Sequence, residues 1–146
     1  MQTKSRSKKR RKKSLRVRLR KTAWDLCSKY IRLHYADRED YVQCYTCPTK
    51  KYWKEMQAGH GLSGRYDSIL LELDLLRPQC YGCNIPNHGR HDVFAYKLIK
   101  EYGIERYNEL HRQRLQDKKF TIQELEEKVV FFRQKLEEEL LCEPKL

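Results

Sequence analysis

The sequence lacks the features that identify membrane, secreted and nucleotide-binding proteins. Its 146 residues contain no run of about 18 apolar side chains, so we expect no membrane span and no membrane partner. The N-terminus has no apolar stretch like that of a secretory signal peptide, which favours a cytoplasmic protein. No Gly-rich phosphate loop, serine nucleophile motif or dinucleotide fingerprint is present either. Because 36% of the residues are charged, the core must be modest, as in one small domain with appendages.

Acidic residues are missing from the first 21 positions. Residues 1–21 hold 12 Lys and Arg and no Asp or Glu, whereas the rest of the chain holds 20 basic and 20 acidic side chains. The whole net charge of +12 therefore lies in this basic segment, which we expect to be disordered until a polyanion neutralises it. Contacts with phosphates release counterions, so DNA is the favoured partner, and a solubilising or targeting tail is the alternative. The candidate nucleic-acid-binding residues are Lys8, Lys9, Arg10, Arg11, Lys12, Lys13, Arg16, Arg18, Arg20, Lys21 and, farther along the chain, Arg65.

Four of the six cysteines form two Cys-x-x-Cys pairs. The pairs are Cys44 with Cys47 and Cys80 with Cys83, and 32 residues separate them. Without a secretory signal a disulfide framework is not expected, and two such pairs are typical of a structural Zn²⁺ site, with a redox motif as the minor alternative. The other two, Cys27 and Cys142, fall in helical patterns and are interpreted as small apolar residues.

Apolar spacing predicts helices on both sides of the cysteine-containing region. A helix is expected over 22–40, starting at Thr22 or at Ser14 and ending in the acidic stretch 37–40. Helices are also expected over 91–102, with Val93, Tyr96, Leu98 and Ile99 facing inward and Gly103 as the stop, and over 104–114. The last helix opens with a capping box, Thr121-x-x-Glu124. Its apolar stripe packs on the N-terminal helix or, alternatively, forms a homodimer seam: Ile122, Leu125, Val129, Phe132 and Leu136.

The region between the cysteine pairs reads as short strands and loops. "YVQCYTC", "PTKK" and "YWKEMQAGH" predict a β-hairpin whose turn holds Cys44 and Cys47, with His60 leaving its second strand. Residues 69–76 fit a strand or a helix equally well. The stretch "RPQCYGCNIPNHG" predicts a second metal-binding loop.

His60 stands among three glycines, in "MQAGHGLSG". Phosphodiester hydrolysis needs a base that activates water and a cation that neutralises the developing charge. A neutral imidazole accepts a proton near pH 7, and Gly59, Gly61 and Gly64 would let the backbone approach a phosphate closely. His60 is therefore the candidate catalytic base, with a plain loop histidine as the alternative.

A second metal ion would be needed, because a tetrathiolate leaves zinc no open position. His88, His91 and Asn84 offer imidazole and amide ligands for a divalent ion, and Asp92 adds a carboxylate. Either histidine alone is as easily a solvated or helix-capping residue.

The same motifs resemble the phage NinG recombination proteins, also called Rap, whose zinc-held site is related to the HNH (ββα-metal) endonucleases. The resemblance covers about Trp24 to Leu110 and rests on "AWDLCSKYIRLHYADREDYVQCYTC", "YWKEMQAGH", "PQCYGCN" and "YKLIKEYG". It implies a zinc-held HNH-like core over 41–103. Together with the charge distribution and the helical patterns, this predicts a small α+β fold with a basic segment over 1–21, a helix over 22–40 and C-terminal helices over 104–146.

The resemblance also implies an activity, that of a structure-specific DNA endonuclease acting on branched recombination intermediates such as Holliday junctions, in the host cytoplasm. It assigns catalysis to His60 and zinc binding to the four paired cysteines. At the place of the family's usual Asn the chain has Leu75, so Asp74 and His91 would substitute at a catalytic Mg²⁺ or Mn²⁺. If these residues do not substitute, the alternative is that the chain is a non-catalytic, zinc-stabilised DNA-binding accessory protein.

Overall fold

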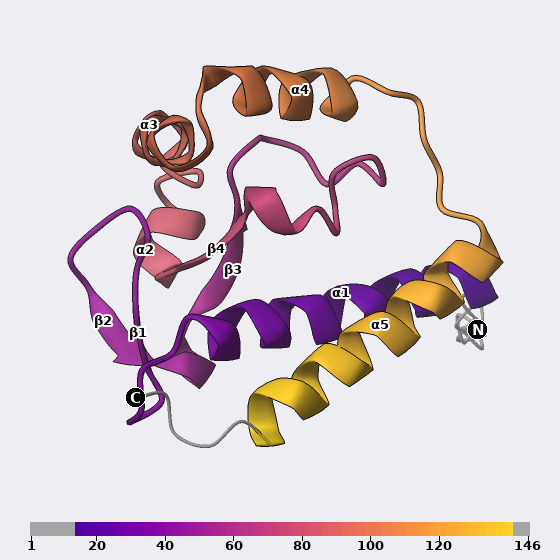
Figure 1. The fold of residues 1–146 in the computed structure, drawn as a ribbon, viewed down its shortest axis with the longest axis horizontal. Coiled ribbons are helices and arrows are strands. Elements are labelled where there is room, and N and C mark those ends of the chain that lie inside the picture. The colour runs from indigo at the N-terminus through magenta and orange to yellow at the C-terminus, as the bar shows by residue number, and fades with distance from the viewer. Residues whose placement is uncertain (1–13, 142–146) are drawn as a thin grey trace, which may run out of the picture.

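A computed structural model describes residues 14–141, which form a small α+β fold with two separate two-stranded sheets (Figure 1). Among these residues no helix is long and apolar enough to cross a membrane. The elements in chain order are α1 (Leu15–His34), β1 (Tyr41–Gln43), β2 (Lys50–Tyr52), the 3₁₀ turn η1 (Trp53–Glu55), β3 (Gln57–His60), the 3₁₀ turn η2 (Leu73–Leu75), β4 (Leu76–Gln79), α2 (Tyr81–Asn84), α3 (His91–Tyr102), α4 (Ile104–Arg114) and α5 (Ile122–Leu141).

Helix α1 begins at the earlier of its two predicted starts. The Ser14 side chain accepts a hydrogen bond from the Val17 N–H at 3.4 Å, which satisfies one of the free donors of the first turn. Residues 15–21 of the basic segment are therefore helical, and the expectation of disorder is wrong for them. The helix ends at His34, short of the predicted 40. Residues 1–13 lie outside the described part of the chain.

Helices α1 and α5 pack along their length, as the apolar stripe predicted (Figure 1). The α5 capping box forms, because the Thr121 hydroxyl accepts from the Glu124 N–H at 3.1 Å and the Glu124 carboxylate accepts from the Thr121 N–H at 2.9 Å. Ile122 is exposed. The other four stripe residues are buried in one cluster with the inner face of α1: Leu125, Val129, Phe132 and Leu136. The stripe proposed as a dimer seam is thus covered within one chain.

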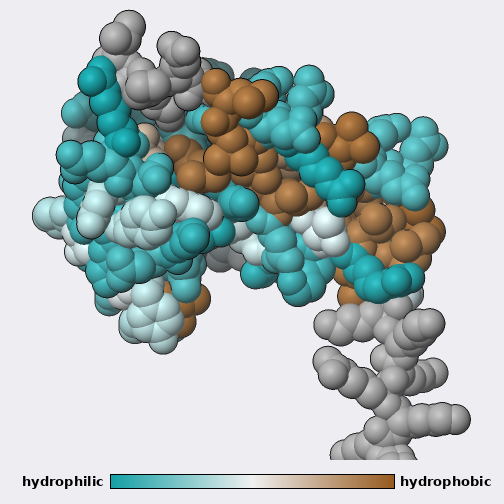
Figure 2. Space-filling view, turned by 90° about the horizontal axis from the view of Figure 1, so that it is seen from below, coloured by the Kyte–Doolittle hydropathy of each residue, from teal (hydrophilic) through white to brown (hydrophobic). Residues whose placement is uncertain are grey.

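Apolar side chains also remain on the outside of the helix pair. Val130 and Leu140 of α5 are about two-thirds exposed, at 64% and 66%. Figure 2 shows brown residues gathered in a band over this side of the molecule. Cys142 lies outside the described residues.

The strands differ from prediction in how they pair. The β1–β2 hairpin forms, and its turn carries Cys44 and Cys47 as expected. His60 does not belong to this hairpin, because η1 ends it and a new strand, β3, begins at Gln57. Strand β3 pairs antiparallel with β4, with His60 opposite Leu76. Residues 69–76 are neither a full strand nor a helix, since they form turns and η2 before β4 starts.

Strand β4 is anchored to α3 and α1 through a buried arginine. Arg77 is 2% exposed and donates to the Glu101 carboxylate at 2.7 Å. Its guanidinium lies 5.3–5.5 Å from the ring centres of Tyr35, Tyr45 and Tyr102. A buried cation needs such partners, so this cage fixes β4 against the rest of the fold.

The bounds of α3 and α4 agree with the sequence prediction, but one inward residue was wrong. Phe94 and Leu98 of α3 are fully buried, whereas Tyr96 is 67% exposed. Residues four apart share a helix face, and Tyr96, two positions from both, faces the opposite side. The buried residues pack in one cluster with Leu75 and Leu110, which joins α3, η2 and α4.

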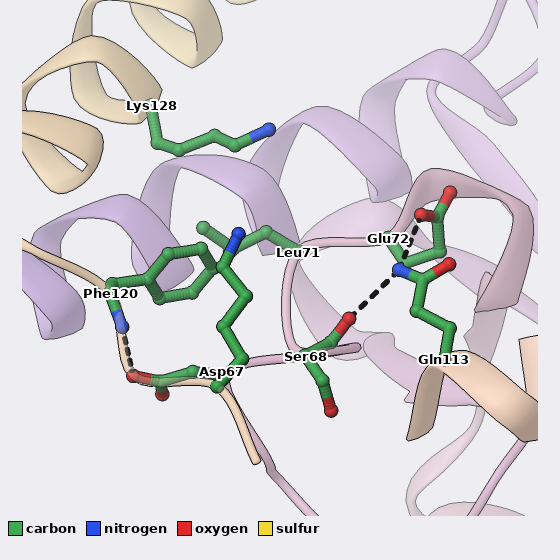
Figure 3. Close-up of a pocket in the computed structure, with 8 residues that line it drawn as sticks. Asp67, Ser68, Leu71, Glu72, Gln113, Phe120 and Lys128 are labelled. Carbon is green, nitrogen blue, oxygen red and sulfur yellow. Dashed lines mark hydrogen bonds between the residues drawn. The ribbon is translucent and has the colours of Figure 1, made fainter. Parts of the chain in front are cut away.

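The connection from α4 to α5 is tied to the turns before η2 around a pocket of about 100 Å³ (Figure 3). The Asp67 carboxylate accepts from the Phe120 N–H at 2.8 Å. Gln113 of α4 donates to the Ser68 carbonyl oxygen and to the Glu72 carboxylate, at 2.8 and 3.0 Å. These polar groups are occupied in holding the chain together.

Candidate functional site

The two Cys-x-x-Cys pairs meet in one cluster. The β1–β2 turn supplies Cys44 and Cys47, and the start of α2 supplies Cys80 and Cys83. All four sulfur atoms lie within 4.8 Å of one another. The Sγ atoms of Cys47 and Cys80 are 3.7 Å apart, too far for a disulfide. Tetrahedral Zn–S bonds of about 2.3 Å would separate two sulfurs by about 3.8 Å, so the cluster could hold a zinc ion.

The electrostatics of the cluster also favour a cation. Burial raises the pKa of Cys83 to about 12. Burial acts in the same direction on Cys47, but hydrogen bonds from Thr49 and from neighbouring cysteines outweigh it and lower the pKa of Cys47 to about 6. The Cys47 thiolate thus forms readily, while Cys83 resists ionisation, chiefly because it is buried. A bound divalent cation removes that conflict by stabilising all the thiolates.

A buried hydrogen-bonded link connects this cluster with the start of α3. The Thr46 hydroxyl lies 3.6 Å from Cys44 Sγ and accepts from Gln79 Nε2 at 2.9 Å. The same Gln79 nitrogen donates to the Gly89 carbonyl oxygen at 2.8 Å. Gln79 is fully buried, so these bonds are not exchanged with water. The cysteine loops and the turn before α3 are therefore held in one arrangement.

The glycines around His60 have a different role from the one predicted. A Cβ atom on Gly59 would lie 1.9 Å from Gln79 Oε1, and one on Gly61 would lie 2.5 Å from Leu98 Cδ1. Both glycines are buried, so they make room for Gln79 and α3 and not for a phosphate. Gly64 has a φ of +93°, which a turn requires and which other residues rarely adopt.

His60, the last residue of β3, is fixed in one tautomer. Its Nε2 lies 3.0 Å from the Leu70 carbonyl oxygen, which only accepts, so Nε2 carries the hydrogen and Nδ1 has the free lone pair. The imidazole stacks on the Trp24 indole of α1, with 4.9 Å between ring centres. Burial lowers the pKa of His60 to about 4, although the Leu70 bond opposes this, and the charges of Arg65 and His91 lower it further. The imidazole is therefore neutral at pH 7.

His60 opens into a cleft of about 200 Å³ between α1, β3 and the segment from α2 to α3. The structure brings most of the predicted site residues together around it: His60, Arg65, Asn84, His88 and His91. Asn84 is oriented by its Nδ2, which donates to Gln57 Oε1 at 2.7 Å and leaves the amide oxygen available. The Arg65 guanidinium lies 4.6 Å from the Trp24 ring centre, close to the ring on which His60 stacks.

His88 and His91 are placed by an unusual left-handed turn. His88, Gly89 and Arg90 have φ values of 51°, 84° and 46° in succession. Such angles in non-glycine residues cost about 1–3 kcal/mol each and are found where the surroundings enforce them. His91 Nδ1 lies 3.4 Å from the Gly61 carbonyl oxygen. A Cβ atom on Gly89 would lie 3.1 Å from His91 Nε2, so a larger residue at this position would crowd the His91 ring.

Asp74, a predicted site residue, lies elsewhere, as does its neighbour Leu75. Asp74 is not among the residues that line the cleft, and its carboxylate accepts from Arg106 Nε and Nη2 at 3.0 and 2.8 Å. Leu75 is fully buried in the apolar cluster with α3 and α4. Its carbonyl oxygen accepts from the Gly61 N–H at 2.7 Å, so the backbone of Leu75 braces the end of β3. The structure therefore places Asp74 outside this cleft, in an ion pair with α4, and does not support its assignment to the site.

Several basic candidates are already paired within the molecule. Asp67 accepts from Arg20 at 2.6 Å and from Arg16 at 3.4 Å, and Lys21 forms an ion pair with Asp25. Arg18 is exposed and has no acidic partner within residues 14–141. Residues Lys8, Lys9, Arg10, Arg11, Lys12 and Lys13 lie outside that range.

Sequence reasoning missed three residues that shape the site. Trp24 falls within the predicted N-terminal helix, but helical spacing does not show which ring it meets. Thr46 and Gln79 belong to no recognisable motif. Their hydrogen bond depends on the pairing of β3 with β4, and strands of four residues are too short to be predicted from sequence periodicity. The one available signal was the position of Thr46 between two ligand cysteines, because hydroxyl groups there often hydrogen-bond to the sulfur atoms.

Comparison with protein-family models gives a match over most of the chain. The family model described as "Bacteriophage Lambda NinG protein" matches residues 1–140. Comparison with curated proteins and with solved structures gives no match. The family match extends beyond the Trp24–Leu110 resemblance at both ends, and it includes the basic segment and most of α5.

Proposed function

Because the chain belongs to the family of the bacteriophage lambda NinG protein, we propose that it is a metal-dependent endonuclease acting on branched DNA recombination intermediates. Family membership indicates a phage recombination-related function. The succession of β3, β4 and α3 supports the nuclease proposal, since His60 ends the first strand and His91 begins the helix. This is the order expected of a ββα-metal core.

The observation that carries the proposal is the state of His60. Its Nε2 is committed to the Leu70 carbonyl oxygen, its ring is neutral, and Nδ1 remains as the proton acceptor beside a cleft lined by two further histidines. A histidine that served only to fill the core would not need His88 and His91 beside it in a cleft. A general base requires this combination of fixed tautomer, neutral form and access.

Each residue in the cleft has a separate role in the proposed hydrolysis. His60 Nδ1 takes a proton from the attacking water, and Arg65 offers a positive charge to the phosphate. His88, His91 and the Asn84 amide oxygen would hold a divalent ion, whose chemistry when bound is to neutralise charge on the phosphate and the leaving oxygen. The left-handed turn orients His88 and His91, and it is itself held by Gln79.

The ligand set favours Mn²⁺ over Mg²⁺. Imidazole nitrogens suit transition metals, while Mg²⁺ prefers oxygen ligands such as carboxylates. No acidic residue is among those that line the cleft in the described chain. We therefore expect cutting with Mn²⁺ at lower metal concentration than with Mg²⁺.

The experiment is incubation of zinc-loaded protein with linear, forked and four-way DNA at increasing Mn²⁺ or Mg²⁺. The proposal predicts cuts in forked and four-way DNA, more readily with Mn²⁺, and little cutting of linear duplex. Equal cutting of all three forms would contradict structure specificity. The absence of cutting with either metal would contradict the enzyme.

A non-catalytic, zinc-stabilised DNA-binding accessory protein is the second candidate. It is favoured by the ion pair that removes Asp74 from the cleft and by the burial of Leu75. The same DNA panel separates the two, because this candidate predicts binding to the DNA, measured by mobility shift, without any strand scission.

A further inference from the structure

Three basic side chains surround one tryptophan at the far end of α1. The charged groups of Lys29, Arg32 and Lys54 lie 5.8, 5.3 and 5.6 Å from the centre of the Trp53 ring. Lys29 and Arg32 come from α1, whereas Trp53 and Lys54 come from η1. We call these four residues, together with the exposed Lys51 of β2, the Trp53 surface.

The positive charge of the Trp53 surface is largely uncompensated. Lys29, Lys51 and Lys54 have no acidic partner within residues 14–141, and Asp37 near the hairpin is taken by Lys50 at 2.6 Å. The same 3₁₀ turn contains one acidic residue, Glu55. Its single negative charge is smaller than the combined positive charge of the basic residues of the Trp53 surface. Like charges gathered around one ring repel one another, and an anionic partner would relieve that repulsion.

The Trp53 surface is linked to the chain that leads into β3, the strand that ends at His60. The Arg32 guanidinium donates to the Met56 carbonyl oxygen at 3.4 Å, which joins α1 to the chain immediately before β3. Trp24, whose ring stacks on His60, precedes Lys29 on α1 by little more than one turn. At 1.5 Å per residue and 3.6 residues per turn, Arg18 and Lys29 lie about 17 Å apart on one face of α1, and Trp24 lies between them along the axis but on another face.

We propose that the Trp53 surface binds the phosphodiester backbone of the DNA that enters the cleft. The DNA would then be held on both sides of His60, by the basic segment with Arg18 toward the start of α1 and by the Trp53 surface toward its end. This inference rests on the proposed DNA partner. It adds contacts that the concentration of charge in residues 1–21 did not suggest, because residues 29, 32, 51 and 54 come from a part of the chain with no net charge.

The test compares two charge-neutralising double variants of the full, zinc-loaded chain. The first is Lys29→Gln/Lys54→Gln, and its control is Lys100→Gln/Arg112→Gln, exposed residues of α3 and α4, two helices that lie across the molecule from α1 (Figure 1). Affinity for forked DNA is measured from 50 to 200 mM salt. Losing two phosphate contacts should weaken binding about tenfold and reduce the salt slope by about 1.8, while the control stays within about twofold of the wild type.

Fluorescence gives a direct readout of the same surface. The chain has two tryptophans, so in a Trp24→Phe background the emission comes from Trp53 alone. DNA should change this emission, and Lys29→Gln/Lys54→Gln should abolish the change at DNA concentrations near the wild-type Kd. Zinc content and melting temperature are measured for every variant, so that unfolding is not mistaken for lost contacts.

The outcomes separate this inference from the proposed function. If the wild type binds DNA and Lys29→Gln/Lys54→Gln binds with the same affinity and salt slope, the Trp53 surface is not a DNA contact, and the proposed function stands. An equal loss in the control variant would likewise overturn the inference, because the effect would be one of net charge. If the wild type binds no DNA, both fail.

Discussion

His60 is held between the Trp24 ring and the Leu70 carbonyl oxygen, and its surroundings keep the imidazole neutral. A pKa of about 4 makes it a weak base at pH 7, but one that is always available to accept a proton. An anionic phosphate in the cleft would raise that pKa toward the working pH. At the residue scale, burial thus keeps the imidazole neutral, and the hydrogen bond to Leu70 leaves Nδ1 as the accepting atom.

The lowered pKa of His60 predicts a pH-dependent stability. Between pH 6.5 and 4 the unfolded chain binds a proton at His60 and the folded chain does not, so the free energy of unfolding falls as the pH falls. The loss is on the order of 2–3 kcal/mol. The free energy of unfolding is measured in urea for wild type and His60→Gln, each at pH 7 and at pH 4.5. Between these two pH values, the wild type should lose more stability than His60→Gln by that amount. Zinc release by acid affects both proteins, so equal losses would contradict a buried neutral His60.

Gly59 and Gln79 should behave as a coupled pair. Gly59→Ala places a Cβ against Gln79 Oε1, and overpacking of this kind costs about 1–3 kcal/mol. In a Gln79→Ala background the amide is gone, so the added methyl group should cost much less. The four proteins form a double-mutant cycle measured by denaturant unfolding. An additive cycle would show that Gly59 is required for another reason, such as substrate approach.

At the element scale, four short segments depend on the cysteine cluster. The β1–β2 hairpin and α2 contain the four sulfur atoms, and Gln79 extends the link to the turn at Gly89. Strands of three or four residues and a one-turn helix are not stable alone, so a bound metal would supply much of their stability. Helices α1 and α5 have their own apolar cluster and depend less on the metal.

Loss of one zinc ligand should therefore unfold the protein in parts. Cys80→Ser should release the metal and increase hydrogen exchange across the hairpin, α2 and the turn at Gly89, while the middle of α5 stays protected. The control is Cys27→Ala, since Cys27 is a buried cysteine outside the cluster. It should keep its zinc and the exchange pattern. Native exchange in Cys80→Ser without bound zinc would refute a structural metal site.

Local signals explain which elements the sequence could predict. The capping box at Thr121, the glycine stop at Gly103 and the Cys-x-x-Cys spacing each act within a few residues, and the helices and the cluster that they predicted are present. The β3–β4 pairing was missed because its register depends on contacts across the intervening turns. The roles of Gly59 and Asp74 were missed for the same reason, since Gln79 and Arg106 are distant in sequence.

At the scale of the whole molecule, the cleft lies where three parts of the fold meet. The α1–α5 pair contributes Trp24, strand β3 contributes His60, and the left-handed turn before α3 contributes His88 and His91. Separate apolar clusters support the α1–α5 pair with β3, the cysteine loops, and α3 with α4, and buried polar groups such as Gln79 and Arg77 join these regions. The site therefore depends on the relative placement of all three parts, and composition and charge could indicate only the class of partner.

The central claim, that His60 is the base of a DNA-cutting site, is tested most directly by single-turnover cutting of four-way DNA with Mn²⁺. His60→Ala is compared with His111→Ala, which removes an exposed histidine on α4. We predict that His60→Ala keeps DNA binding and zinc but cuts about 10²–10⁴ times more slowly, the usual loss when a general base is removed. His111→Ala should cut at the wild-type rate. Equal rates for wild type and His60→Ala would contradict the claim.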